Sequence, residues 1–203
     1  MMSNEFSRFF RSLERDKQYT LKRNAIVKKE FDRIKKQMID EFDAHPITQE
    51  IEMGINAPNL SNTLNGITNL YSFIGFDSGS KPIDPIRQLL EKSTFRISSG
   101  GKLLATATFE IPTAKMIFTA TPMPWADGRS WAKGIERGIS GLGYYIKKRK
   151  NSRSGLGVQS QNKVRGGLKF QNTKYISALI NKYERIFRDL NKKQLWNQHF
   201  TMM

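Results

Sequence analysis

Almost a quarter of the chain is unsuited to an ordinary hydrophobic core. The 47 residues between Glu136 and Glu184 contain no Asp or Glu, and they carry eleven Lys and Arg. Residues 151–167 are also rich in Gly, Ser, Asn and Gln, so they bury too little apolar surface to offset the entropy lost on ordering. We therefore predict an extended basic loop over residues 147–173 that contacts an anion or a neighbouring subunit.

The basic side chains of this loop are the candidate contact residues, because they can neutralise phosphate groups or bind an acidic neighbour. They are Lys147, Lys148, Arg149, Lys150, Arg153, Lys163, Arg165 and Lys169. The wider acid-free segment is interleaved with Tyr144, Tyr145, Phe170 and Tyr175, and aromatic stacking combined with charge is typical of sequence-independent nucleic-acid binders. No helix-turn-helix, zinc-finger or RNA-recognition signature accompanies the segment, so the pattern indicates non-specific contact.

The whole chain has the composition of one globular domain with a strong positive charge. Of its 203 residues, 38% are hydrophobic and 26% are charged, and the formal net charge is +16. No segment approaches the roughly 20 apolar residues of a membrane-spanning helix. The first thirty residues contain no apolar signal segment. We expect a single domain over residues 1–203, with a helical arm at residues 1–24, synthesis in the cytoplasm and no membrane contact.

Hydrophobic periodicity predicts helices near both ends of the chain. A helical pattern covers residues 4–42, with a break near residues 19–24 and an end before Pro46. The most regular amphipathic pattern covers residues 175–190 and predicts a helix that pairs with the first one or with a copy of itself. Apolar spacings of three and four also predict a glycine-containing helix over residues 131–146.

The segment between these helices favours β-structure. Residues 94–97 and 103–111 flank a Ser-Gly-Gly turn, which predicts a hairpin. Apolar runs at residues 70–76 and 115–120 are read as further strands, and residues 84–93 as a short helix. The expected fold class is α+β, with an antiparallel sheet of three or four strands.

Two groups of residues are predicted to form interfaces. The apolar stripe Phe6, Phe9, Phe10 and Leu13 spans barely two turns, too short for a stable helix alone, so we expect it to pack on another subunit. Trp125, Arg129 and Trp131 surround a Gly-Arg-Ser turn and are expected to form a fixed corner, in the protein's own core or at an interface.

The sequence offers no catalytic, cofactor-binding or metal-binding constellation. The chain has no Cys and two His, His45 and His199, which excludes thiolate chemistry and leaves too few nitrogen or sulfur ligands for zinc. No phosphate-binding loop, dinucleotide fingerprint or nucleophile elbow occurs. We therefore expect no enzyme and no cofactor, and keep a small hydrolase or nuclease only as a remaining alternative.

The run from Gly128 to Tyr145, preceded by Pro-Met-Pro-Trp at residues 122–125, resembles the neck and tail-completion proteins of tailed bacteriophages. The order of a long basic helix, a hairpin sheet and a C-terminal amphipathic helix agrees over residues 25–195. The chain departs from that pattern in its longer basic loop.

The resemblance implies a non-enzymatic virion protein at the head–tail junction. It implies a homo-oligomeric ring, assembled in the host cytoplasm, that contacts portal, neck or tail proteins and packaged DNA. The alternative from the residues alone is a non-specific nucleic-acid-binding protein that acts as a monomer or dimer.

Overall fold

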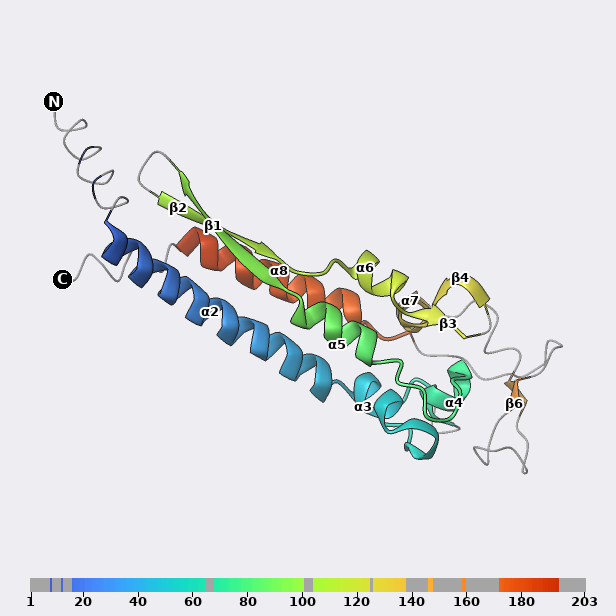
Figure 1. The fold of residues 1–203 in the computed structure, drawn as a ribbon. Helices are drawn as coiled ribbons and strands as arrows, with labels where there is room; N and C mark the ends of the chain where they lie inside the picture. The colour runs from blue at the N-terminus through green and yellow to red at the C-terminus, as the bar shows by residue number, and fades with distance from the viewer. Residues whose placement is uncertain are drawn as a thin grey trace. The chain divides into compact units, whose positions relative to one another are not determined.

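The computed structural model describes residues 16–64, 68–100, 104–124, 126–137 and 172–193, together with residues 8, 12, 146–147 and 158–159. In chain order the elements are α2 (Lys17–Ala44), α3 (Pro46–Glu52), η1 (Gly54–Asn56), α4 (Leu70–Ile74), α5 (Asp84–Glu91), β1 (Thr94–Gly100), β2 (Leu104–Glu110), α6 (Ala114–Thr119), β3 (Pro122–Met123), β4 (Ala126–Ser130), α7 (Trp131–Arg137), β5 (Ile146–Lys147), β6 (Val158–Gln159) and α8 (Ile176–Lys193) (Figure 1). The α+β fold class is therefore confirmed.

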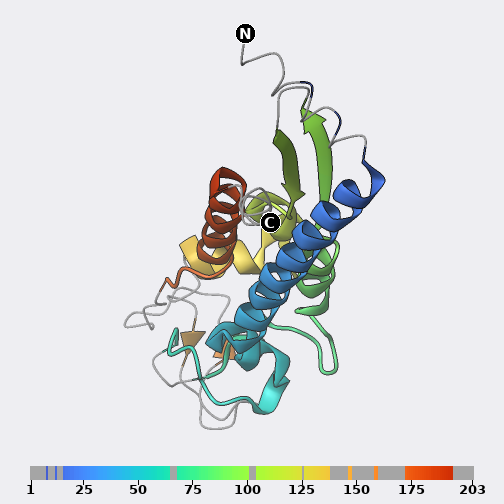
Figure 2. The same cartoon turned by 90° about the vertical axis from the view of Figure 1, so that its left-hand side faces the viewer.

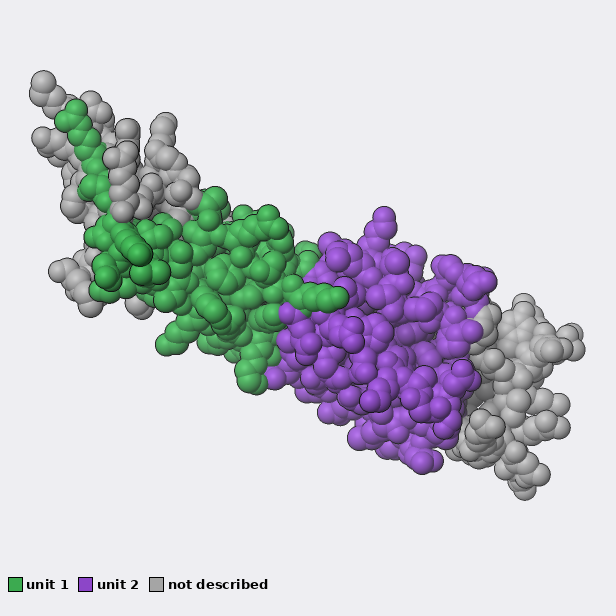
Figure 3. Space-filling model, viewed as in Figure 1, with its two compact units in different colours: residues 1–38, 92–111, 182–203 green, residues 39–91, 112–181 purple. Residues whose placement is uncertain are grey.

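The chain divides into two compact units, coloured separately in Figure 3. Unit 1 comprises residues 1–38, 92–111 and 182–203, and unit 2 comprises residues 39–91 and 112–181. The boundaries fall within α2 and within α8, so each of these helices contributes to both units.

An aromatic cluster joins three segments of unit 1. The ring of Phe31 on α2 lies 5.1 Å from that of Phe95 on β1 and 5.7 Å from that of Phe187 on α8. Phe109 on β2 stacks on Phe187 at 4.8 Å. Aromatic pairs at such separations contribute about 0.5–1.5 kcal/mol each beyond the area they bury. The cluster holds the first part of α2, the hairpin and the second part of α8 side by side (Figures 1 and 2).

The hairpin of unit 1 is antiparallel, as predicted. Its register runs from Thr94 opposite Glu110 to Gly100 opposite Leu104. Successive residues of a strand point to opposite faces, so one face carries the Phe side chains and the other is exposed. Pairing continues through Ser99 and Gly100, so these two residues of the predicted turn belong to β1.

Unit 2 is built around large apolar side chains that are almost fully buried. They come from the second part of α2, from α3, α4, α5 and α7, and from the loop before α5. They include Phe42, Ile47, Ile51, Leu70, Ile74, Ile83, Ile86 and Trp131. Trp131 is 1% exposed and meets the ring of Phe76 edge-on, with centroids 5.8 Å apart.

Glu50 on α3 is a buried acid that organises the chain after that helix. Its Oε1 accepts hydrogen bonds from the Leu70 N–H at 2.7 Å and from Asn59 Nδ2 at 3.0 Å. Its Oε2 accepts one from the Ser61 N–H at 2.7 Å. A fully buried carboxylate is tolerated only with such partners. It therefore holds three points of the following segment against α3.

His45 separates α2 from α3 and caps the second helix. The residue before a proline is disfavoured in the helical conformation, and His45 is extended, with ψ at 132°. Its Nδ1 accepts a hydrogen bond from the Ile47 N–H at 3.2 Å. The imidazole also lies 4.8 Å from the ring of Tyr175, whose hydroxyl bonds Thr48 in the core. An Nδ1 that accepts a hydrogen bond must be unprotonated, so the folded state favours neutral His45.

We expect the stability of the protein to fall when His45 becomes protonated. Burial lowers the pKa of His45 below its ordinary value of 6.5, and Glu41 opposes this only in part. The unfolded chain therefore takes up the proton first, and stability present above pH 6.5 is lost as the pH falls through the folded pKa.

Urea unfolding at pH values from 8 to 5 would measure this loss. His45→Asn keeps a capping side chain without a titrating group and should lose less stability over that range. His199→Asn removes the other imidazole and serves as the control. Equal pH dependence in wild type and His45→Asn would contradict the assignment.

Two segments predicted as strands are helices. Residues 70–76 and 115–120 contain α4 and α6. The side chains of Asn69 and Thr113 each accept a hydrogen bond from the backbone N–H three residues later, which caps the helices. Short apolar runs fit the helical period of 3.6 residues and the strand period of two residues equally well, so these caps decide the structure. The predicted sheet of three or four strands is wrong, because the described strands form three separate two-stranded sheets.

Two predicted helix boundaries are also wrong. α2 shows no break at residues 19–24, and it begins at a cap where Asp16 Oδ1 accepts a hydrogen bond from the Gln18 N–H at 2.7 Å. The helix predicted over residues 131–146 is described as α7 up to Arg137, and it does not reach Ile146, which pairs with Gln159 in β5 and β6. Residues 138–145, between these two elements, lie outside the described residues.

The helices predicted at residues 84–93 and 175–190 are present as α5 and α8. The contact between Phe31 and Phe187 pairs α8 with α2 within unit 1, one of the two expected arrangements. Among the described helices, none combines the length and apolarity needed to cross a bilayer.

Candidate functional site

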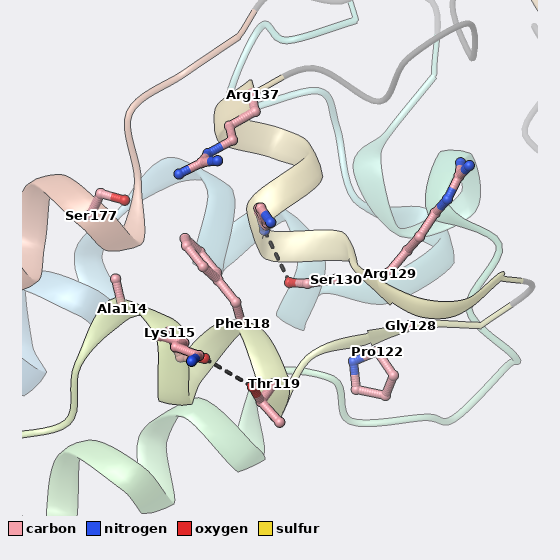
Figure 4. Close-up of a pocket in the computed structure, with 11 residues that line it drawn as sticks. Ala114, Lys115, Phe118, Thr119, Pro122, Gly128, Arg129, Ser130, Arg137 and Ser177 are labelled. Carbon is pink, nitrogen blue, oxygen red and sulfur yellow. Dashed lines mark hydrogen bonds between the residues drawn. The ribbon is translucent and has the colours of Figure 1, made fainter.

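A hollow of about 640 Å³ opens on unit 2 beside α6, β4, α7 and the start of α8 (Figure 4). Small-molecule sites in proteins commonly enclose about 300–1,000 Å³. The apolar part of the lining includes Ala114, Phe118 and Pro122, and most of the remaining lining side chains are basic or carry a hydroxyl.

Four cations line this hollow, and its described lining residues include no carboxylate. Lys115 comes from α6, Arg129 from β4, and Lys133 and Arg137 from α7. Lys133 and Arg137 are four residues apart and share a helix face. All four residues are exposed, and none is paired with an acid of the described chain. The described lining therefore carries four positive charges and no carboxylate.

Glu136 on α7 is bound to the beginning of α8. Its carboxylate accepts hydrogen bonds from the Ser177 N–H at 2.6 Å and from the Ser177 hydroxyl. A carboxylate is favourable at this point because a helix N-terminus carries partial positive charge. The Thr173 N–H also donates to the Ile135 carbonyl at 3.2 Å. These contacts hold α7 and the start of α8 together and fix one wall of the hollow.

A second set of hydrogen bonds fixes the start of α7. Thr121 Oγ1 donates to the Ile117 carbonyl at 2.9 Å, which uses its only proton. Ser130 Oγ therefore donates to Thr121 Oγ1 at 2.8 Å, and it accepts from the Lys133 N–H at 3.1 Å. This chain of bonds ties the end of α6 to the first turn of α7, so the backbone that carries Lys133 is held in place.

Phe118 on α6 directs its ring into the hollow, toward the side where Ser177 and Arg137 lie (Figure 4). The ring is partly exposed, whereas the adjacent Ile117 is fully buried. The hollow thus combines an accessible aromatic ring with unpaired cations.

The described lining is suited to binding an anion, and its hydroxyl groups are not activated as nucleophiles. The Thr119 hydroxyl donates to the Lys115 carbonyl at 3.0 Å, and the Ser177 hydroxyl donates to Glu136. No described histidine lines the hollow to activate either hydroxyl. Across the described residues, no group of three or more His, Asp and Glu could hold a metal ion.

Most of the residues predicted as contacts lie outside the described side chains. Of the predicted basic contacts in the loop, only Lys147 is described, by its backbone in β5. The predicted loop contacts Lys148, Arg149, Lys150, Arg153, Lys163, Arg165 and Lys169 lie outside the described residues, as do Phe6, Phe9, Phe10, Leu13 and Trp125.

The two described residues of the predicted corner have different environments. Trp131 is buried in the core of unit 2. Arg129 is exposed at the hollow, and Figure 4 shows its side chain extending away from that of Arg137. The cations best placed around Phe118 are therefore Lys115, Lys133 and Arg137.

Sequence reasoning did not single out these three cations as a site. Arg137 opens the acid-free segment, and its spacing from Lys133 is a readable helical signal. Lys115 lies in a segment predicted as a strand, so its proximity to α7 was not foreseeable. Comparisons of the chain with protein-family models, curated proteins and solved structures give no match.

Proposed function

We propose that this protein is a non-enzymatic structural protein that contacts the nucleic-acid backbone, as a ring subunit at the head–tail junction of a tailed bacteriophage. The observation that carries the nucleic-acid contact is the hollow of unit 2, where exposed cations have no described acidic partner. Arg137 at this hollow is also the first of eleven cations in the acid-free segment.

The physical basis of the contact is charge neutralisation. Each Lys or Arg that pairs with a phosphate releases a condensed counterion, which favours binding regardless of sequence. A net charge of +16 adds long-range attraction to a polyanion. A protein of this kind would hold packaged DNA without reading its bases.

The place at the head–tail junction rests on the resemblance of residues 122–165 to neck and tail-completion proteins. The long helix, the hairpin and the C-terminal helix, in that order, are consistent with it. In this proposal portal, neck or tail proteins and copies of the same chain are the protein partners, and the virion is the location.

Protein composition of purified particles tests the structural role directly. Quantitative mass spectrometry of virions of the phage that encodes the chain should find it as a stoichiometric component. Its absence from particles that contain portal and tail proteins would overturn the head–tail assignment.

A non-specific nucleic-acid-binding protein that acts alone is the second candidate, favoured by the same cations. Sedimentation of virions after nuclease treatment separates the two. A virion subunit remains with the particles, whereas a free binding protein is released with the degraded nucleic acid.

The cations of the hollow should contribute measurably to DNA binding. Replacing Lys115, Lys133 and Arg137 with Gln should weaken binding to duplex DNA of any sequence. The slope of log K against log salt should flatten by up to about 2.7, because each lost phosphate contact removes about 0.9 from it. Fluorescence anisotropy across a salt series would measure both changes.

Two further sets of substitutions, one in the predicted loop and one in unit 1, are compared with the hollow variant. Lys147, Lys148, Arg149 and Lys150 changed to Gln test the predicted loop in the same way. Lys22, Lys29 and Lys92 are exposed cations of unit 1, and changing them to Gln removes the same charge as the hollow variant. If this control lowers the slope as much as the hollow variant does, net charge explains the binding and the hollow is not a site.

A further inference from the structure

We infer that the hollow of unit 2 binds one unpaired nucleotide, whose base stacks on Phe118 and whose phosphate pairs with Lys115, Lys133 and Arg137. This inference deepens the proposed function and rests on its nucleic-acid contact. It adds to the backbone contact a base-stacking contact, which an unpaired nucleotide can make and an intact duplex cannot.

The first step concerns the aromatic ring. Phe118 is partly exposed although the neighbouring Ile117 is fully buried, so one large apolar side chain of α6 is directed into the hollow instead of the core. Figure 4 shows the ring between the backbone of α6 and the side of Arg137. The half-buried ring of Phe118 offers an apolar surface to the face of a base, and Ala114 and Pro122 line the same hollow.

The second step concerns the cations that line the same hollow as the ring. Lys133 and Arg137 come from one face of α7, and Lys115 comes from the same helix as Phe118. The backbone around them is held by the Ser130 and Glu136 hydrogen bonds described above. A phosphate attached to a stacked nucleotide would therefore meet positive groups on elements whose positions are already fixed.

The third step concerns what the hollow lacks. The hydroxyl protons of Thr119 and Ser177 are donated within the protein, and Ser130 donates to Thr121. These hydroxyls can accept a hydrogen bond from a base but cannot donate one, and the charged groups of the lining are the cations. Stacking and charge then determine binding, as in sequence-independent single-strand binders.

The fourth step separates single-stranded from duplex ligands. In a duplex the faces of internal bases are covered by their neighbours, so an intact duplex presents mainly phosphates to the hollow. An unpaired nucleotide presents both a base face and a phosphate, and it can use Phe118 as well as the cations.

The central test compares Phe118→Leu with Phe118→Tyr in the full chain. Leu keeps an apolar side chain without a stacking face, and Tyr keeps the ring. Phe118→Leu should weaken binding of oligo-dT by about tenfold and leave duplex affinity unchanged, whereas Phe118→Tyr should bind oligo-dT as wild type does. Unchanged oligo-dT affinity in a folded Phe118→Leu protein would overturn the inference.

A measurement on the wild-type protein covers the case in which Phe118→Leu fails to fold. An oligonucleotide carrying 2-aminopurine, a base whose fluorescence falls on stacking, should be quenched when bound. Binding without quenching would overturn the stacked geometry.

Thymidine monophosphate and inorganic phosphate, titrated separately, distinguish a nucleotide within a strand from a free nucleotide or a phosphate-only site. Inorganic phosphate that competes as well as the nucleotide would exclude a role for the base.

The same measurements separate this inference from the proposed function. If duplex binding falls in the variant of Lys115, Lys133 and Arg137 while Phe118→Leu changes nothing, the backbone contact stands and the nucleotide site fails. If neither variant changes binding to any nucleic acid, the hollow has no part in the contact. Both the backbone contact and the nucleotide site at the hollow are then excluded.

Discussion

Trp131→Ala is expected to lower the free energy of unfolding by about 3 to 5 kcal/mol, the range found for removal of large aromatic side chains from a core. Trp131 is 1% exposed, and its indole meets Phe76 edge-on at 5.8 Å in unit 2. The substitution leaves a cavity and removes that contact. Urea denaturation followed by circular dichroism would measure the loss.

Met116→Ala supplies the control for this truncation. Met116 lies on α6 with 51% of its surface exposed, so its removal should change stability by no more than about 0.5 kcal/mol. Were Trp131→Ala to unfold at the wild-type urea concentration while particle assembly failed, Trp131 would act at an interface, the other role predicted for the corner.

Glu50→Ala should also destabilise the protein by about 3 to 5 kcal/mol, because it leaves buried hydrogen-bond donors without an acceptor. The donors are the N–H groups of Ser61 and Leu70 and the side-chain amide of Asn59. Loss of the carboxylate also releases the segment after α3. Chemical denaturation would report the change in free energy, and proteolysis would report opening near residues 59–70.

Glu52 on the same helix is the matched control. It is an acid whose side chain is 49% exposed, paired with Arg87 at 3.0 Å. Exposed ion pairs contribute about 0–1 kcal/mol, so Glu52→Ala should have a small effect. Equal destabilisation by the two substitutions would show that the hydrogen bonds of Glu50 have no special role in stability.

The long helices are predictable from the sequence because their apolar pattern is sustained. On α2, buried Val27, Phe31, Ile34 and Met38 recur at spacings of four and three, and no strand could bury the same set. α4 and α6 are too short for such a test. Their helical state depends on the caps at Asn69 and Thr113, which act on backbone groups rather than on the apolar pattern.

The candidate site was less predictable than the fold. A run of charges such as residues 147–150 is visible in any sequence, whereas the hollow gathers Lys115 and Arg137 from different helices. Only the packing of α6 against α7 brings them together. The same holds for Phe118, because an apolar residue inside an apolar run is normally assigned to the core.

Unit 1 is assembled from distant segments of the chain, which has a consequence for folding during synthesis. Its aromatic cluster needs Phe31 from α2, Phe95 from the hairpin and Phe187 from α8, which are widely separated in the sequence. A ribosome releases these segments in order, and closing such long loops carries an entropic cost. Unit 1 therefore cannot close until α8 has emerged. Until then the rings of Phe31 and Phe95 lack their contact with Phe187. During this interval the nascent hairpin exposes apolar surface, and association with other chains is most favoured.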